Sequence, residues 1–356
     1  MTDHNEVLPV LTWTADEEQE MYRAAAALTT DPATDPDMFC VQARAAAHYC
    51  VPKRIFQAIR TFFNKDEGGG ILLVKTPSPS AATASTTLPA TPPDNRQHLG
   101  ETTLLAKWQA LLVHAVAQGI AYEAEGGGRL FQDVVPTQHM AALQTSLGSA
   151  TELEIHTEQA FSPWRPDLLC LGCLRGDPAA WTHWFSVDRL LPHLTEAERT
   201  LLQQPLWETR VDLSFRLGRD TPFRLGDVRG PFPILATDPP TAPPTAPPTA
   251  PPRHTLLFDQ DLMRGITPEA AALLPRLVDL YHTHRLSVCL QPGDILLLDN
   301  RRGVHGRSAF HPRFDGRDRF LVRCFGITDA TTVAAREQHP HVLATTNNRM
   351  VRAEES

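Results

Sequence analysis

The chain lacks any long apolar run and any sign of a secretory leader. No stretch of the sequence approaches the roughly 18 consecutive apolar residues that a membrane-spanning helix needs. Its first residues, MTDHNEVLPVLTW, lack the basic and apolar segments of a signal peptide. From these absences we expect a cytoplasmic protein that does not associate with membranes.

Cysteine is scarce, since six residues in a chain of 356 are too few for a disulfide scaffold. Cys170 and Cys173 form a single CxxC. Without a second such pair to complete four ligands, core packing is favoured over a zinc or redox site. The other four lie in apolar surroundings and are expected to be buried free thiols: Cys40, Cys50, Cys289 and Cys324.

An excess of positive charge is also absent. The formal charge of -8 and the isoelectric point near 6.0 leave no basic surface for nucleic acid or an anionic membrane, so small molecules and proteins remain as partners. The sequence has no GxxxxGK[ST] loop, no strand-linked GxGxxG and no GxSxG elbow. These absences argue against nucleotide binding and against a serine hydrolase.

The first third of the chain, residues 1–128, is rich in predicted helices. Thr14 and Glu17 have the spacing of a capping box and predict a helix over 14–28. Residues 51–63 predict a second helix, and the apolar periodicity of residues 100–122 predicts a long amphipathic helix. Between them, the β-rich run ILLVKT at 71–76 predicts a strand.

From residue 129 onward, short strand-like runs separated by turn residues dominate. Such spacing favours an antiparallel sandwich or barrel over a parallel α/β sheet. Thr267 and Pro268 predict the start of one helix over 267–286. The predicted strands lie within residues 129–135, 152–158, 168–174, 183–188, 210–217, 254–261, 287–291, 294–300 and 319–328.

Two proline-rich stretches offer little to a core. Residues 239–252 repeat the unit TAPP and predict an extended surface loop, with binding to a proline-recognition domain as the alternative. Residues 76–95 are predicted to form a loop or lid, and residues 336–356 a polar tail.

The polar run TELEIHTEQAF at 151–161 contains the first candidate for chemistry. Because side chains alternate along a strand, His156 and Glu158 are expected on one face, close enough to bind one metal ion. This HxE is weak evidence alone, because solvated strand faces carry such pairs by chance. A second histidine, His305, follows an apolar strand and a tight loop. Two histidines and one carboxylate would form a facial triad with three open iron positions.

Two arginines strengthen this interpretation. Arg319 follows His305 at the start of an apolar run, and Arg323 lies four positions further and is expected to face the same way. Burying two guanidinium groups is costly unless each meets a carboxylate, so their presence predicts anionic ligands. His311 is a competing metal ligand, but the spacing to Arg319 favours His305. We expect solvated positions for the remaining histidine pairs, His282 with His284 and His339 with His341.

Two segments, QTSLGSATELEIHTEQAFSPWRPDLLCLGCLRGD and GDILLLDNRRGVHGRSAFHPRFDGRDR, resemble the clavaminate synthase-like branch of the taurine-dioxygenase superfamily. Its members are Fe(II)- and 2-oxoglutarate-dependent oxygenases that include amino-acid hydroxylases of antibiotic pathways. Weaker similarity extends over most of residues 1–335, and the TAPP insert is foreign to the pattern. The resemblance implies one oxygenase domain over 1–356, mainly β with flanking helices, whose residues 129–335 form a double-stranded β-helix, or jelly roll.

The resemblance also implies roles for single residues. Fe(II) is expected on His156, Glu158 and His305, with O₂ at an open iron position. Arg319 would clamp the distal carboxylate of 2-oxoglutarate, and Thr182 would add a hydroxyl group there. An intact Glu158 favours hydroxylation or desaturation, because halogenating relatives have a small residue at that position.

Other residues are expected around an amino-acid substrate. The resemblance implies that Arg323 holds its α-carboxylate, while Ser146 and the backbone near Gln144 hold its amino-acid end. Asp259 and Asp261 would share a face of an extended segment, and paired carboxylates match a guanidinium group. They predict a free basic amino acid, arginine ahead of lysine. The plain alternative is a solvated loop before the helix at 267.

Three other readings stay open. The substrate could be a neutral amino acid, or it could be bound to a carrier protein, in which case Arg323 would lose its natural partner. The chain could also be a metal-binding β-barrel without turnover, but that reading gives no reason for Arg319 and Arg323.

Overall fold

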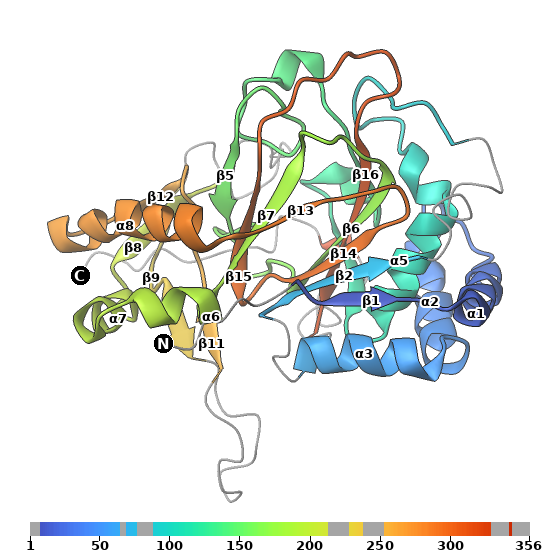
Figure 1. Cartoon of the computed structure of the whole chain (residues 1–356), viewed down its shortest axis with the longest axis horizontal. Coiled ribbons are helices and arrows are strands. Elements are labelled where there is room, and N and C mark those ends of the chain that lie inside the picture. The colour runs from blue at the N-terminus through green and yellow to red at the C-terminus, as the bar shows by residue number, and fades with distance from the viewer. Residues whose placement is uncertain are drawn as a thin grey trace, which may run out of the picture.

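The computed structural model describes residues 8–64, 69–76, 88–212, 228–237, 253–328 and 342–343. The TAPP insert at 239–252 and all of the tail at 336–356 except residues 342–343 lie outside the described residues, as does most of 76–95 up to residue 87. Two β-sheets stack face to face in the middle of the molecule. One group of helices covers the outer side of each, so the protein is mainly β with flanking helices (Figure 1).

The N-terminal helices cover one side of the molecule (Figure 1). The predicted capping box is present, because the Thr14 hydroxyl accepts a hydrogen bond from the Glu17 backbone and the Glu17 carboxylate accepts one from the Thr14 backbone. The helices are α1 (Ala15–Ala26), α2 (Pro36–Tyr49), α3 (Lys53–Asn64) and α5 (Leu104–His114).

The predicted helix over 100–122 is wrong at its C-terminal end. Helix α5 stops at His114, and residues Gln118–Tyr122 form strand β3, which pairs with a central strand of the large sheet. A side chain at Gly119 would come within 2.9 Å of the His114 ring, so glycine lets the chain turn back closely over the helix end. Periodicity alone could not separate this short apolar strand from the preceding helix.

The large sheet has a central strand, β16, that pairs antiparallel with β6, β3 and β4. The sheet is antiparallel except that β1 pairs parallel with β2, and β17 with β3. Its order is β1 (Val10–Thr12), β2 (Ile71–Lys75), β14 (Ile295–Asp299), β6 (Leu168–Arg175), β16 (Phe320–Ile327), β3 and β17 (Val342–Leu343), with β4 (Gln132–Val134) beside β16.

The small sheet faces the large one and is antiparallel throughout. It contains β13 (Leu286–Cys289), β7 (Trp181–Ser186), β15 (Gly303–Arg307) and β5 (Leu153–His156), in that order. His305 therefore follows strand β14 and a short turn, as expected, and lies within strand β15. The sequence GVHGR has little β propensity, and the strand forms because β7 and β5 pair with it on both sides.

Apolar residues form three clusters that follow this layering. On the central strand β14, Ile295 and Leu297 pack toward the N-terminal helices, whereas Leu296 and Leu298 pack into the space between the sheets. A strand buried on both faces reads as a continuous apolar run, which is why DILLLDN was recognisable. The third cluster joins the small sheet to α6 (Val187–Leu190), α7 (Glu196–Leu202) and α8 (Pro268–His284).

Short elements complete the described part. A three-stranded sheet contains β12 (Met263–Gly265), β8 (Trp207–Arg210) and β9 (Val228–Phe232), and a two-stranded antiparallel sheet contains β10 (Leu235–Thr237) and β11 (His254–Leu256). Single 3-10 turns occur at Leu99–Thr102, Gly126–Gly128, Gln138–Met140 and Leu191–His193.

All six cysteines are free thiols. Cys170 packs toward the helices and Cys173 between the sheets, so the CxxC thiols lie on opposite faces of β6 and serve core packing. The expectation of burial is confirmed for Cys40 and Cys324, but it is wrong for Cys50, which is exposed at the end of α2, and Cys289 is only partly buried. None of the described helices has the length and apolar character needed to cross a membrane.

Shortening a side chain on β14 tests the layered core. Leu297 is 0% exposed, so Leu297→Ala should lower the free energy of unfolding by about 3 kcal/mol through lost burial and a residual cavity. Urea unfolding followed by circular dichroism measures the change. Val41, 58% exposed on α2, provides the control, since Val41→Ala should change the value by less than about 0.5 kcal/mol. Equal effects of the two substitutions would contradict the layering.

Candidate functional site

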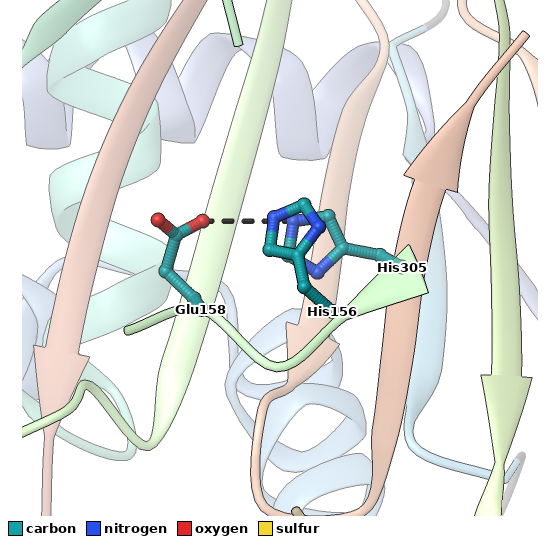
Figure 2. Close-up of side chains that lie close together, drawn as sticks. All are labelled: His156, Glu158 and His305. Carbon is teal, nitrogen blue, oxygen red and sulfur yellow. Dashed lines mark ion pairs between the residues drawn. The ribbon is translucent and has the colours of Figure 1, made fainter. Parts of the chain in front are cut away.

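Two histidines face each other across neighbouring strands of the small sheet. His156 on β5 and His305 on β15 are directly paired in the antiparallel register, and their ring centroids lie 4.3 Å apart. The Glu158 carboxylate points into the same space, with its Oε2 atom 3.5 Å from His305 Nε2 (Figure 2). One ligand atom from each of the three residues lies within 4.8 Å of the others. Among the described residues, this is the one group of three that could hold a metal ion.

Glu158 does not extend strand β5, contrary to the expectation of a shared strand face. The strand ends at His156, and Glu158 lies in a turn in which Gln159 has a positive φ of 55°. The buried side chain of Asn300 fixes this turn. Its Oδ1 accepts a hydrogen bond from the Glu158 backbone at 2.8 Å, and its Nδ2 donates to the Glu158 and Pro166 carbonyls at 3.1 and 2.8 Å.

The protonation states suit a metal ion. Burial raises the pKa of Glu158, but the positive charge of Arg323 and the contacts with His305 and His156 outweigh it, so the pKa falls to about 2. Burial and the neighbouring His156 lower the pKa of His305 to about 4. The Nδ1–H of His156 donates to the Glu154 carbonyl at 2.8 Å, which leaves Nε2 as the free ligand atom. An ionised carboxylate and two imidazole nitrogens are a donor set that fits Fe(II).

Two pockets adjoin the triad, and His156, Glu158, Ser146 and Arg323 line both. The first, the acidic pocket, is also lined by Glu125, Gln144, Glu154, Asp212, Asp259 and Asp261. The second, the arginine pocket, is also lined by Thr182, His305, Arg307, Arg319 and Leu321.

The arginine pocket contains two buried guanidinium groups that form no ion pair with a carboxylate of the described residues. The guanidinium carbons of Arg307 and Arg319 lie 4.9 and 5.9 Å from the centroid of the Phe310 ring. Burial, together with the nearby Arg319, lowers the pKa of Arg307 to about 9. The hydroxyl of Thr182 is buried there without a hydrogen-bond partner. The pocket therefore favours an anion. Arg307 lies there together with Arg319 and Thr182, the two residues that the sequence analysis assigned to 2-oxoglutarate.

Arg323 is different, because the protein itself supplies its carboxylates. Its guanidinium group bonds Glu158 at 3.2 Å and also bonds Glu125 and Gln132. The charge of this arginine is therefore balanced within the protein, and its contact with the α-carboxylate of a substrate stays a prediction. Glu125, which precedes GGG at 126–128, was missed, because a glutamate in a glycine-rich loop gives no sign of pairing with a strand residue far along the chain.

Acidic side chains dominate the first pocket. Asp259 is buried and forms a β-bridge with His156, and its carboxylate accepts a hydrogen bond from the Leu262 backbone at 2.8 Å. The segment is thus a turn and not the extended strand that was expected, although Asp259 and the exposed Asp261 both line the pocket. The half-buried Glu154 lies with them. Neither Glu154 nor Asp261 forms an ion pair with a cation of the described residues. Burial, together with the negative charges of Asp261 and Glu152, raises the pKa of Glu154.

The remaining polar residues around β5 have separate partners. Glu152 pairs with Arg285 at 2.6 Å. The Gln144 amide bonds the backbone at both Glu152 and Glu154, so it braces the strand. Ser146 is half-buried and faces both pockets.

The competing histidines lie elsewhere. His311 and His282 are exposed, and His284 stacks on His193 with a centroid separation of 3.7 Å. His339 and His341 lie outside the described residues. None of the described competitors reaches the triad.

Comparison with known proteins settles the family. The family described as "Taurine catabolism dioxygenase TauD, TfdA family" matches residues 114–325, the stretch that contains all three triad residues. The chain belongs to this family. Membership in it confirms the predicted class, an Fe(II)- and 2-oxoglutarate-dependent dioxygenase.

Similar proteins cover three quarters or more of the chain. It is 44% identical over 328 residues to L-lysine 3-hydroxylase of Catenulispora acidiphila, covering 92% of this chain and 86% of that one. It is 34% identical over 271 residues to L-asparagine oxygenase of Streptomyces coelicolor, covering 75% and 74%. A crystal structure of asparagine oxygenase with Fe(II), (2S,3S)-3-hydroxyasparagine and succinate superposes with a TM-score of 0.80 at 29% identity, covering 94% of this chain and 99% of that one.

The role of Asn300 can be tested directly. Asn300→Ala removes three hydrogen bonds that hold Glu158 and Pro166, so we expect Fe(II) affinity to fall by about 10- to 100-fold. Anaerobic Fe(II) titration measures this affinity, and thermal unfolding checks that the fold persists. Asn95→Ala, in the loop before α5, serves as a control that should leave metal binding unchanged. A metal affinity of Asn300→Ala equal to that of the native protein would contradict the assigned role.

Proposed function

We propose that this protein hydroxylates a free basic amino acid, L-lysine ahead of L-arginine, with Fe(II) and 2-oxoglutarate. The observation that carries the substrate proposal is the acidic pocket beside the triad. There, Glu154 and Asp261 have no cation of the described residues as a partner. Two carboxylates without a counter-charge favour a ligand with a positive side chain.

In this proposal Fe(II) is bound by His156, Glu158 and His305. The iron, with 2-oxoglutarate and O₂, supplies the oxidising chemistry when bound. The residues of the chain hold the metal at the inner face of the small sheet, orient the reacting C–H group and limit access of water. We further infer that the two stacked sheets form the double-stranded β-helix, or jelly roll, that the resemblance implied.

The arginine pocket is proposed as the 2-oxoglutarate site. Arg319 would pair with the distal carboxylate, and the free hydroxyl of Thr182 would donate a hydrogen bond to it. This assignment also argues against the alternative that the protein is a metal-binding barrel without turnover. Such a protein would have no use for a buried arginine that lacks a carboxylate partner.

The amino-acid substrate is proposed to occupy the acidic pocket. Its zwitterionic head would lie against the Glu125–Arg323 ion pair, with the ammonium group beside Glu125, the α-carboxylate beside Arg323 and Ser146 alongside. A carrier-bound amino acid has a thioester instead of that carboxylate, so a free amino acid fits better. The distal amine would then reach the other acidic side chains, Glu154, Asp259 and Asp261.

Lysine replaces arginine as the first choice of substrate. The paired aspartates suggested a guanidinium group, but carboxylates that lie in a turn act equally well on the point charge of an ammonium group. The similarity to L-lysine 3-hydroxylase supports lysine at 44% identity over 92% of this chain.

Substitution of the triad tests the metal assignment. His156→Ala, Glu158→Ala and His305→Ala should each abolish succinate formation and lower Fe(II) affinity, because each removes one ligand of the same ion. His311→Ala, which changes an exposed histidine six residues after His305, is the matched control and should keep full activity. Full activity in any one of the three triad variants would remove that residue from the metal site.

Substitution of the acidic pocket tests the substrate. Glu154→Gln and Asp261→Asn should each raise the KM for L-lysine by about tenfold or more, since each removes a charge-assisted contact, and should leave the KM for 2-oxoglutarate unchanged. Succinate release coupled to mass spectrometry of the product measures both. Glu196→Gln, on the exposed first turn of α7, is the control. Preference for asparagine or another neutral amino acid, with normal kinetics in both variants, would overturn the substrate proposal and leave the enzyme class intact.

A further inference from the structure

Arg307 is a buried residue of the arginine pocket to which neither the sequence nor the proposed mechanism gives a role. It lies on β15 two residues after His305, and its strand partner across β7 is Thr182. Residues paired in this way present their side chains to the same face of a sheet. Arg307 therefore stands beside the proposed 2-oxoglutarate site, and it is only 4% exposed.

Charge in this pocket is unbalanced. Arg307 and Arg319 lie against the same Phe310 ring, and no carboxylate of the described residues forms an ion pair with either. Two buried guanidinium groups of like charge repel each other, and each carries a desolvation cost. A dicarboxylate in the pocket would offset both effects, whereas a monoanion would offset them only in part.

Arg307 also holds a loop that belongs to the other pocket. Its Nη2 group donates to the Gly148 carbonyl at 3.0 Å, and its Nη1 group donates to the Ser308 carbonyl at 2.8 Å. Gly148 is part of the loop at 137–150, which is closed by a hydrogen bond from the Thr137 backbone to the Leu147 carbonyl at 3.0 Å. The same loop carries Ser146, which lines both pockets.

We propose that Arg307 is a positioning residue that couples the 2-oxoglutarate pocket to the amino-acid pocket. Without the dianion, repulsion from Arg319 weakens the hold of Arg307 on Gly148, and the loop that carries Ser146 is poorly fixed. With the dianion bound, Arg307 is stabilised between the anion and the Gly148 carbonyl, and the loop is ready for the amino acid. Such coupling is reciprocal, so the amino acid strengthens 2-oxoglutarate binding by the same factor.

Calorimetry tests the coupling without turnover. The protein is loaded with Fe(II) under argon, 2-oxoglutarate is titrated alone, and L-lysine is then titrated with and without saturating 2-oxoglutarate. In the native protein, 2-oxoglutarate should raise the affinity for lysine by about fivefold or more, the lower end of typical coupling between sites.

Two substitutions separate the charge of Arg307 from its geometry. Arg307→Lys keeps the charge but lacks the planar fork that reaches two carbonyl groups. Its affinity for 2-oxoglutarate should therefore stay within about threefold of the native value, whereas the rise in L-lysine affinity caused by 2-oxoglutarate, here called the lysine enhancement, should be lost. Arg307→Gln should also lose the enhancement, and it should bind 2-oxoglutarate about tenfold more weakly because a charge-assisted contact is gone. Melting temperatures establish that both variants are folded.

The controls isolate Arg307 from its neighbours. Arg319→Gln should weaken 2-oxoglutarate binding, and it should also reduce the lysine enhancement, because without the repulsion from Arg319 the side chain of Arg307 holds Gly148 before 2-oxoglutarate binds. Arg129→Gln, which breaks a distant ion pair with Glu101, should change neither quantity. A native-like enhancement in folded Arg307→Lys and Arg307→Gln would overturn the coupling, as would its absence in the native protein.

The use of L-lysine in these titrations rests on the proposed function. The proposed substrate and the proposed role of Arg307 can fail separately. If lysine does not bind the native protein, the proposed substrate is wrong. The same titrations are then made with the amino acid that supports succinate formation, and they decide the role of Arg307 in the same way. The 2-oxoglutarate affinities of the variants do not depend on the substrate.

Discussion

The buried pairing of Arg323 with Glu158 is the interaction on which the site depends. Glu158 is only 6% exposed, and burial alone would favour its neutral form, which is a poor metal ligand. The guanidinium group of Arg323 keeps the carboxylate ionised and shares its remaining donors with Glu125 and Gln132. Arg323 comes from the large sheet and the histidines from the small sheet, so the stacking of the two sheets brings charge compensation and metal ligands together.

The same stacking divides the space between the sheets by polarity. Leu296, Leu298 and Leu321 fill it with apolar side chains, and the arginine and acidic pockets adjoin the triad. The apolar part stabilises the stack, whereas the polar part carries charge that the protein balances incompletely. The imbalance has opposite signs in the two pockets, positive around Arg319 and negative around Glu154. A cosubstrate with two carboxylates and a basic amino acid would complete both.

Local sequence signals predicted the elements that form for local reasons. The capping box at Thr14 and the apolar run of β14 were readable because each depends on neighbouring residues or on simple two-sided burial. The signals failed where partners far along the chain decide. Residues 118–122 became a strand because β16 pairs with them, and GVHGR became a strand because two neighbours pair with it. Glu158 lies in a turn because Asn300 binds its backbone.

The sequence by itself indicated the chemical class, because His156, Glu158, His305 and Arg319 lie within two continuous segments that resemble a known family. Only the tertiary structure decided how these groups are charged, held and surrounded. Glu125 meets Arg323, Asn300 meets Glu158, and Arg307 meets Gly148 across separations of more than a hundred residues. When sheet stacking brings two partners together, their hydrogen bond or ion pair leaves no pattern in the sequence. The residues that neighbour one partner along the chain carry no information about the other partner.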